Sequence, residues 1–184
     1  MGIYFITSNK GKLEEVRAIT GMDIRSKSIE IAEIQDTDVE KIVKDKAVKA
    51  YSSIKRPVIV EDTGLYIKAL NGFPGALVKW LVDAVGPGGI CKIVSKYSNR
   101  NAYAETCIAF YDGRKLETFS GRIDGTIARS PIGDNGFGWD PIFIPNGQRK
   151  TFAQMGASEK NEISHRRKAA HKLKRYLISR KGSL

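Results

Sequence analysis

The most constraining feature of the sequence is a short run of β-branched apolar residues that ends in two acids. Residues 57–60 read Pro-Val-Ile-Val, and Glu61, Asp62, Thr63 and Gly64 follow directly. Such a run is typical of a buried strand, and we expect the chain to turn sharply at Gly64. Ligands of open α/β sheets gather where strands end. Because neighbouring strand residues point to opposite faces, we expect only one of the two acids to serve chemistry. The alternative to a functional site is a strand followed by a solvated acidic turn.

Composition is that of an ordinary globular protein. The 184 residues are 41% hydrophobic and 28% charged, so we expect residues 1–184 to form one domain, or two lobes that share a sheet. No segment approaches the ~18 apolar residues that span a membrane, and the N-terminus lacks the parts of a secretory signal. Cys91 and Cys107 match no metal or redox motif, which predicts reduced thiols in a cytoplasmic protein.

The net charge of +11 is concentrated near the C-terminus. Residues 147–184 carry 11 basic and 2 acidic side chains. A basic tail of this kind can bind nucleic acid, attract anionic substrates or form the solvated face of a helix. The last is the commonest case, but the charge also favours a polyanionic ligand over a cationic one.

The expected elements change along the chain from βα units to hairpins. Besides the acidic strand, strands are expected at residues 3–6, 103–111, 116–119, 123–128 and 142–144. Helices are expected at residues 13–19, 39–54, 74–85, 90–97 and 163–177, with a break at 87–89. Helical connections followed by hairpins predict an α/β fold with a mixed sheet.

The loop at residues 7–12 is an expected anion site. It precedes a helix and carries the hydroxyl, amide and ammonium groups of Thr7, Ser8, Asn9, Lys10 and Lys12. Free backbone N–H groups and the helix dipole attract anions at such a place. Its glycine and lysine spacing is not that of a Walker loop, and a polar surface loop is the alternative.

Lys46 is predicted to lie on the buried face of the helix at residues 39–54. At ~100° per residue it falls on one arc with the apolar residues Ile42, Val43, Ala47, Ala50 and Ile54. A lysine there must either extend to water or meet an anion. A phosphate at the end of the neighbouring strand would satisfy it better than water.

Residues 136–141 read Gly-Phe-Gly-Trp-Asp-Pro. They place Phe137 and Trp139 on either side of a glycine in a loop. Aromatic faces of this kind stack on nucleobases at ~1–3 kcal/mol per base. The alternative is that the two rings only anchor the loop in the core.

Residues 160–166 lead into the last expected helix. Ser164 is a candidate cap, which leaves His165 and Arg166 on the first turn. The guanidinium group donates in a planar fork that suits carbonyl or phosphate oxygens. A serine hydrolase is not favoured, because no Gly-x-Ser-x-Gly motif is present.

Together these segments resemble the inosine triphosphate pyrophosphatases, a family that hydrolyses non-standard purine nucleoside triphosphates. The motifs cover nearly the whole chain and are 7–12 (Thr-Ser-Asn-Lys-Gly-Lys), 61–65 (Glu-Asp-Thr-Gly-Leu), 69–75 (Ala-Leu-Asn-Gly-Phe-Pro-Gly), 137–141 (Phe-Gly-Trp-Asp-Pro) and 164–166 (Ser-His-Arg). Lys79 before Trp80, and Trp139, are more similar to eukaryotic and archaeal members. The resemblance implies an elongated α/β fold with a long central mixed β-sheet flanked by helices, two lobes with a cleft between them, and a homodimer.

The resemblance also implies roles for individual residues. Asp62 is the implied catalytic base and, with Glu33, the implied magnesium ligand. The implied triphosphate contacts are Thr7, Ser8, Asn9, Lys10, Gly11, Lys12 and Lys46. The other implied substrate contacts are Thr63, Lys79, Phe137, Gly138, Trp139, Asp140, Lys160, His165 and Arg166.

The implied reaction is the magnesium-dependent hydrolysis of ITP, dITP and XTP to nucleoside monophosphate and pyrophosphate. Water oriented by Asp62 attacks the α-phosphorus in line, and Mg²⁺ offsets charge on the phosphate oxygens. Arg166 is expected to donate to the C6 carbonyl of hypoxanthine or xanthine, which adenine lacks.

Two other classes of protein stay open from the sequence. A single-strand or RNA-binding module would use the basic tail and the loop aromatics, but it gives no role to Asp62. A related pyrophosphatase would act on modified pyrimidines or on ordinary nucleotides. We expect a purine nucleotide as the partner, with no stable nucleic-acid partner and no membrane.

Overall fold

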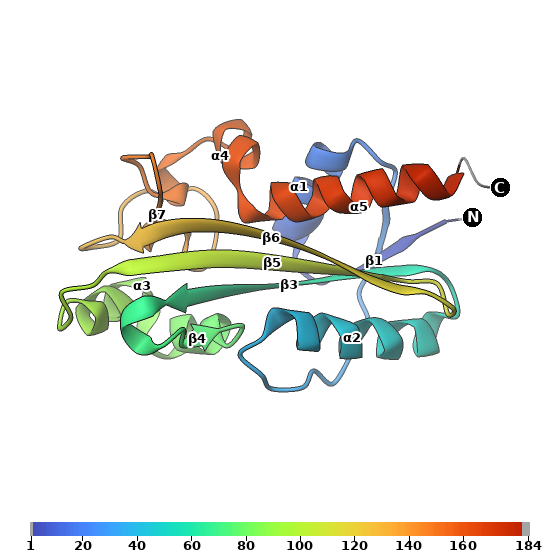
Figure 1. The fold of residues 1–184 in the computed structure, drawn as a ribbon, viewed down its shortest axis with the longest axis horizontal. Helices are drawn as coiled ribbons and strands as arrows, with labels where there is room; N and C mark the ends of the chain where they lie inside the picture. The colour runs from blue at the N-terminus through green and yellow to red at the C-terminus, as the bar shows by residue number, and fades with distance from the viewer. Residues whose placement is uncertain (1, 182–184) are drawn as a thin grey trace.

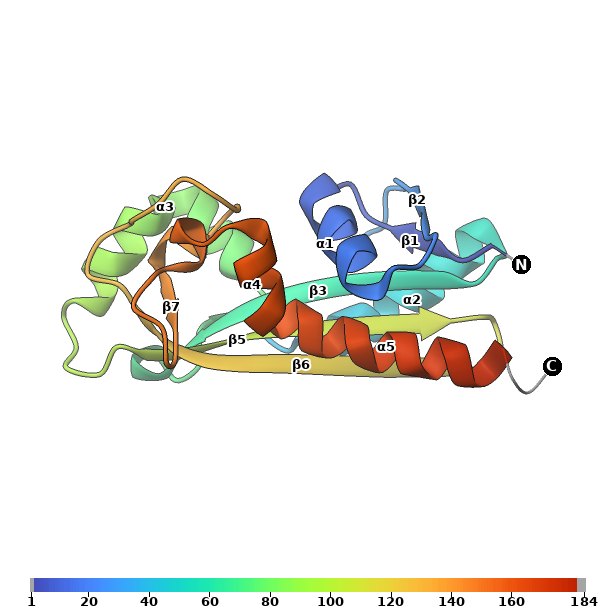
Figure 2. The ribbon, with the colours of Figure 1, turned by 90° about the horizontal axis from the view of Figure 1, so that it is seen from above.

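The computed structural model describes residues 2–181 and contains a long mixed sheet with helices on both faces (Figure 1, Figure 2). Seven strands run in the order β2-β1-β3-β5-β6-β7, with β4 beside β3. The strands are β1 (Tyr4–Ile6), β2 (Arg25–Lys27), β3 (Val58–Ile67), β4 (Pro74–Gly75), β5 (Asn101–Tyr111), β6 (Leu116–Ile127) and β7 (Phe143–Pro145). β1 is parallel to β2 and β3, and the other pairs are antiparallel. The predicted mixed α/β fold is confirmed.

The helices flank the sheet, with α5 over one face and α2 under the other (Figure 1). They are α1 (Lys10–Thr20), α2 (Val39–Ile54), α3 (Val78–Val94), α4 (Ala157–Ile163) and α5 (His165–Lys181). Short 3-10 turns are η1 (Lys68–Leu70), η2 (Asp140–Ile142) and η3 (Phe152–Gln154). Among the described residues, none of the helices is long and apolar enough to cross a bilayer. The division of residues 1–184 into one domain of two lobes stays a prediction.

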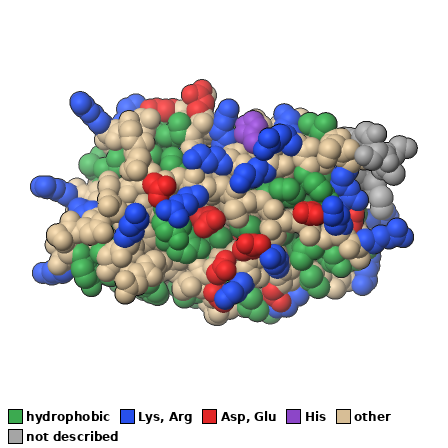
Figure 3. All heavy atoms as spheres, viewed as in Figure 1, with side chains coloured by type: hydrophobic (Ala, Val, Ile, Leu, Met, Phe, Trp, Pro, Cys, Tyr) green, Lys and Arg blue, Asp and Glu red, His purple; other side chains and the backbone are tan. Residues whose placement is uncertain are grey.

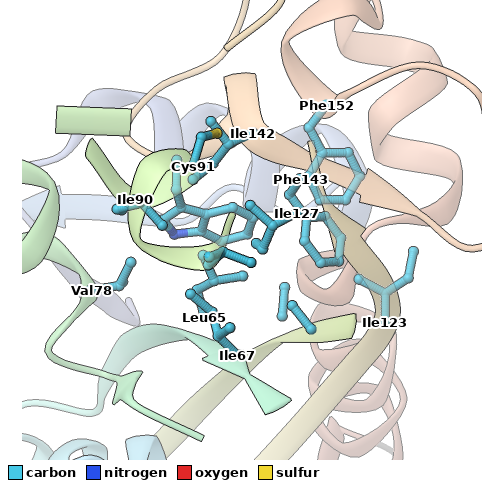
Figure 4. Close-up of a cluster of buried hydrophobic side chains, with 14 of the residues drawn as sticks. Leu65, Ile67, Val78, Ile90, Cys91, Ile123, Ile127, Ile142, Phe143 and Phe152 are labelled. Atoms are coloured by element: carbon cyan, nitrogen blue, oxygen red, sulfur yellow. The ribbon is translucent and has the colours of Figure 1, made fainter. Parts of the chain in front are cut away.

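Alternation along β3 divides the core beneath the helices into two layers. Ile59 packs with α1 and α5, whereas Val58 and Val60 pack with α2. A third cluster, around Leu65 and Phe143, fills the end of the sheet that α3 covers (Figure 4). Each face of the sheet is therefore apolar under its helix, as expected for a sheet covered on both sides.

β3 is longer than the sequence predicts. It pairs with β5 from Val58 to Ile67 and does not end at the acidic residues. Gly64 is not at a turn: a Cβ there would lie 2.6 Å from the Tyr66 ring and 2.9 Å from the carbonyl carbon of Gly75. The predicted turn at Gly64 is wrong, because this glycine is needed for close approach of β4 to an uninterrupted strand.

β6 is also one strand where two were predicted, since pairing with β5 continues through Gly121. The helix predicted to open at Pro74 begins instead at Val78, because Pro74 belongs to β4. The break predicted at residues 87–89 lies one residue earlier, at Gly86, which has φ 67° inside α3. β2 was not predicted, because its three residues are all exposed and carry no apolar pattern.

Lysines of α5 bind the open edge of β6. β7 pairs only with residues 125–127 of this strand. The ammonium group of Lys168 donates to the Arg122 carbonyl at 2.7 Å, and that of Lys172 donates to the Ser120 carbonyl at 2.6 Å. Figure 3 shows Lys and Arg side chains gathered over this helix. Part of the basic tail is thus a solvated helix face that protects a strand edge.

Gly121 allows α5 to rest directly on the sheet, and its replacement by alanine should be strongly destabilising. A Cβ would lie 2.1 Å from the His165 carbonyl oxygen and 2.5 Å from the Ala169 nitrogen, both backbone atoms. We expect Gly121→Ala to lower the free energy of unfolding by about 2–3 kcal/mol or more. Gly88→Ala is the matched control, because the nearest atom there is 3.9 Å away. Equal midpoints for the two variants in urea unfolding would contradict this account.

Candidate active site

The candidate site lies where β3 has no strand partner on one edge. β1 pairs with β3 only as far as Ile59, and β4 pairs with it only from Leu65. Within residues 2–181, the edge of residues 60–64 is therefore open, although β5 pairs with the other edge throughout. A cavity of about 540 Å³ lies there. In Figure 2, α3 and α4 lie to the left of α1, and Figure 1 places α1 and α4 on the same face of the sheet.

The structure brings most of the predicted site residues to this cavity. They are Thr7, Ser8, Asn9, Lys12, Glu33, Lys46, Asp62, Thr63, Lys79, Phe137, Gly138, Trp139, Asp140, Lys160, His165 and Arg166. Lys10 and Gly11 are the exceptions. Lys10 is exposed at the start of α1, and Gly11 packs against Phe137, whose ring would lie 3.1 Å from an added Cβ.

Glu61 and Asp62 both line the cavity although β3 continues past them. The expectation that opposite side-chain directions would keep the two acids out of one site is wrong, whereas the expectation that only one of them serves chemistry stays a prediction. The two side chains do leave opposite faces of the sheet, but the open edge lets both faces reach the same cavity. Sequence alternation alone could not show this, because it says nothing about where a partner strand stops.

The loop at residues 7–12 has the local order that an anion site needs. Asn9 caps α1 by accepting from the Lys12 N–H at 3.1 Å, and Thr7 Oγ1 accepts from the Asn9 N–H at 3.0 Å. Lys12 is mostly buried, and its ammonium group lies 3.4 Å from a Glu61 oxygen. The first turn of a helix and a lysine therefore meet at one end of the cavity.

Asp62 is held in a set orientation beside a second carboxylate. Its Oδ1 accepts from the Thr63 N–H at 2.8 Å. Burial raises the pKa of Asp62, Lys12 opposes the rise, and Glu33 adds to it. Lys46 forms a hydrogen bond with Glu33 and is only 16% exposed, so its predicted place on the buried arc of α2 is confirmed.

Asp62 and Glu33 fit a magnesium ion that arrives with a polyphosphate. Mg²⁺ is usually held by one or two carboxylates, by waters and by substrate phosphates. Within residues 2–181, no group of three or more acidic, histidine or cysteine side chains is arranged around a common metal position. Two carboxylates near two lysines match a site that the phosphates would complete.

Arg166 and Glu61 form a fully buried ion pair. Arg166 Nε and Nη2 donate to the two Glu61 oxygens at 2.8 and 2.9 Å, and Nη1 donates to Glu15. Burial alone would raise the pKa of Glu61, but Arg166 and Lys12 hold it at about 2. The guanidinium group is thus bound between carboxylates, and its contact with a nucleobase stays a prediction. Glu15 was missed, although it follows Lys12 by three residues and so shares its helix face.

Aromatic rings form the other end of the cavity. Trp139 packs on Phe143 and Phe152 in the core and lies 5.5 Å from the His165 ring. Trp139 belongs to the core, as the second interpretation of this loop expects. Phe137 is 36% exposed at the cavity, and its stacking on a base stays a prediction.

His165 and Asp140 add polar atoms to this aromatic end. Burial lowers the pKa of His165 well below its usual value, and Nδ1 has no hydrogen-bond partner among the described residues. Asp140 Oδ2 accepts from the Phe137 N–H at 2.8 Å and from Lys160 at 2.7 Å, which fastens the loop. The predicted cap is confirmed, because Ser164 Oγ accepts from the Arg167 N–H at 3.1 Å.

Lys79 stands at the exposed rim. Its ammonium group donates to Asp83 at 2.6 Å, and its side chain is 76% exposed. The cavity thus combines lysines and carboxylates at one end with aromatic rings and a neutral histidine at the other, an arrangement that can hold a phosphorylated aromatic ligand.

Comparison with known proteins agrees with this arrangement. The model of the Ham1 family matches residues 3–176. The chain is 47% identical over 177 residues to the inosine triphosphate pyrophosphatase of Aspergillus fumigatus, covering 94% of this chain and 92% of that one. It is 41% identical over 178 residues to the dITP/XTP pyrophosphatase of Hyperthermus butylicus, covering 95% and 94%. A Ham1 protein structure from Coxiella burnetii superposes with a TM-score of 0.87 at 28% identity, covering 97% of this chain and 99% of that one.

The resemblance seen in the sequence motifs is therefore confirmed. The family model spans almost the whole chain, and the relatives extend over nearly their full lengths. The chain belongs to the Ham1 family.

Proposed function

We propose that this protein is a nucleoside triphosphate pyrophosphatase that hydrolyses non-standard purine nucleotides, with ITP, dITP and XTP as substrates and Mg²⁺ as the cofactor. The observation that carries the proposal is the cavity at the open edge of β3, where Lys12, Lys46 and Asp62 face an aromatic end. Two relatives are named inosine triphosphate pyrophosphatase and dITP/XTP pyrophosphatase, which supports the same substrate class.

Lys12, Lys46 and the helix N-terminus would bind the phosphates, and Phe137 would stack on the base. Asp62, oriented by the Thr63 N–H, would accept a proton from the attacking water. That water forms a bond to the α-phosphorus as the bond to the pyrophosphate oxygen breaks, so the products are monophosphate and pyrophosphate. Mg²⁺ held by Asp62 and Glu33 would offset the charge on the phosphate oxygens.

The remaining expectations belong to the same proposal. Cys91 and Cys107 are both buried free thiols, which supports a reducing compartment such as the cytoplasm. The homodimer implied by the family resemblance stays a prediction.

A nucleotide panel tests the substrate class. We expect ITP, dITP and XTP to be hydrolysed to monophosphate and pyrophosphate with magnesium and not with a chelator, while ATP, GTP and dUTP react at least about 100-fold more slowly in kcat/KM. Chromatography must resolve monophosphate from diphosphate products. Release of orthophosphate, or equal rates for ATP, would overturn the proposal, and salt-dependent RNA binding without hydrolysis would favour the nucleic-acid module.

Asp62→Asn tests the catalytic base. The amide keeps the volume but removes the charge and the basic oxygen, so kcat should fall by ~10²–10⁴-fold with the fold intact. Asp124→Asn is the control, because that carboxylate lies exposed on β6 and pairs with Arg122. Pyrophosphate release measures both variants. Near-normal turnover of Asp62→Asn at an unchanged magnesium optimum would remove Asp62 from this role.

Lys12→Met tests whether Lys12 binds the triphosphate, and Lys10→Met is its control. Lys12 lines the cavity and Lys10 does not. Loss of a charge-assisted contact should weaken ITP binding by about 10–100-fold and IMP binding far less, whereas Lys10→Met should change neither by more than about threefold. Equilibrium binding in an Asp62→Asn background avoids turnover. Equal losses for ITP and IMP would mean that Lys12 serves the fold.

A further inference from the structure

Six side-chain charges of alternating sign form one connected series of ion pairs in the site. In order they are Lys12, Glu61, Arg166, Glu15, Lys160 and Asp140, which we call the charge chain. No member has a side chain more than 18% exposed. Its residues come from five different elements, so no single helix or strand explains the series.

The first member of the charge chain, Lys12, lies in the loop that we assign to phosphate, and its last two members lie beside the aromatic loop. Asp140 holds the Phe137 N–H at 2.8 Å, and Lys160 lies 4.9 Å from the centre of the Phe137 ring. The charge chain thus joins the phosphate end to the aromatic end.

A direct packing contact follows the same route. The Phe137 ring lies against Gly11, where an added Cβ would be 3.1 Å from Cε1. The start of α1 therefore contacts the aromatic loop. A side chain larger than hydrogen at residue 11 would therefore press on the Phe137 ring.

In such a series, a change in one buried ion pair affects its neighbours. Removing one partner of a buried pair leaves an uncompensated charge, which is strongly unfavourable. The weakest link is between Lys12 and Glu61, at 3.4 Å, and Lys12 is also the most exposed member. A phosphate that binds Lys12 must therefore alter how Glu61 is shared between Lys12 and Arg166.

We propose that Glu61 is a positioning residue that couples phosphate binding to base binding, because its carboxylate holds Lys12 and Arg166 at once. This inference rests on the proposed function of the cavity. A phosphate that takes Lys12 from Glu61 leaves this carboxylate to hold Arg166 alone, so the first ligand changes the arrangement that the second ligand meets. The coupling is positive and, by linkage, reciprocal.

Binding of the two halves of the substrate tests this without turnover. Inosine is titrated by calorimetry with and without saturating pyrophosphate and magnesium, and pyrophosphate is titrated with and without inosine. For the unaltered protein we expect each ligand to tighten the other at least about fivefold. In Glu61→Gln, which keeps the side-chain volume, the mutual effect should fall below about twofold while each half still binds.

Glu33→Gln is the matched control. Glu33 also lines the cavity and holds a lysine, Lys46, but it is outside the charge chain. This variant should change the affinity for pyrophosphate, but inosine and pyrophosphate should still tighten one another's binding. If Glu61→Gln does not fold, Glu15→Gln breaks the charge chain behind the cavity and should abolish the mutual effect in the same way.

The outcomes separate the two proposals. If inosine and pyrophosphate each bind but do not affect one another, or if the mutual effect survives in Glu61→Gln and in Glu15→Gln, the coupling role of Glu61 is overturned while the proposed function stands. If neither half binds the unaltered protein, the coupling role of Glu61 is overturned, and the nucleotide panel decides the proposed function. A similar loss of the mutual effect in Glu33→Gln would also overturn the assignment to Glu61, because any cavity carboxylate would then serve.

Discussion

The open edge of β3 between Ile59 and Leu65 is the constraint on which the rest of the site depends. A strand edge normally needs a partner or a protecting side chain, because its N–H and C=O groups are otherwise unpaired. Here the parallel partner β1 ends early and the antiparallel partner β4 begins late. The interval between them exposes both faces of one strand to a single cavity, so acids on opposite faces can serve one ligand. The loop that follows β1 arrives at the same interval and adds its lysine and its helix N-terminus.

The proposed phosphate site contains the carboxylates of Glu33, Glu61 and Asp62, and the structure compensates two of them with cations. Glu33 is bound by Lys46, and Glu61 is bound by Arg166 and Lys12. Pairs of this kind contribute little net stability, since the desolvation penalty offsets most of the attraction. Their effect is to fix the positions of the cations before a polyanion arrives. A preorganised cluster of donors loses less entropy on binding than flexible surface lysines would.

Local signals in the sequence predicted those parts of the site that depend on a single element. Helical periodicity placed Lys46 on the buried arc, and the Ser164 cap was recognised from residue type. The lengths of β3 and β6 could not be predicted this way, because antiparallel pairing with β5 extends both strands through glycines that resemble turn residues. The bidentate contact between Glu61 and Arg166 spans 105 residues of sequence, so no spacing rule could find it. The spacing of Glu15 from Lys12 could have placed it on the helix face toward the site. Its ion pairs with Arg166 and Lys160 could not have been predicted from spacing.

The placement of Arg166 depends in turn on a residue outside the cavity. Arg166 is on the first turn of α5, and the backbone of that turn rests on Gly121, where no side chain fits. Farther along the helix, Lys168 and Lys172 bind carbonyls of the same strand. β6 therefore fixes both the height of α5 above the sheet and its position along the strand. Since Arg166 must reach Glu61 within hydrogen-bond distance, a shift of about 1 Å at Gly121 would break the bidentate contact. The position of Arg166 in the site thus depends on one close backbone contact at Gly121, a residue that does not line the cavity.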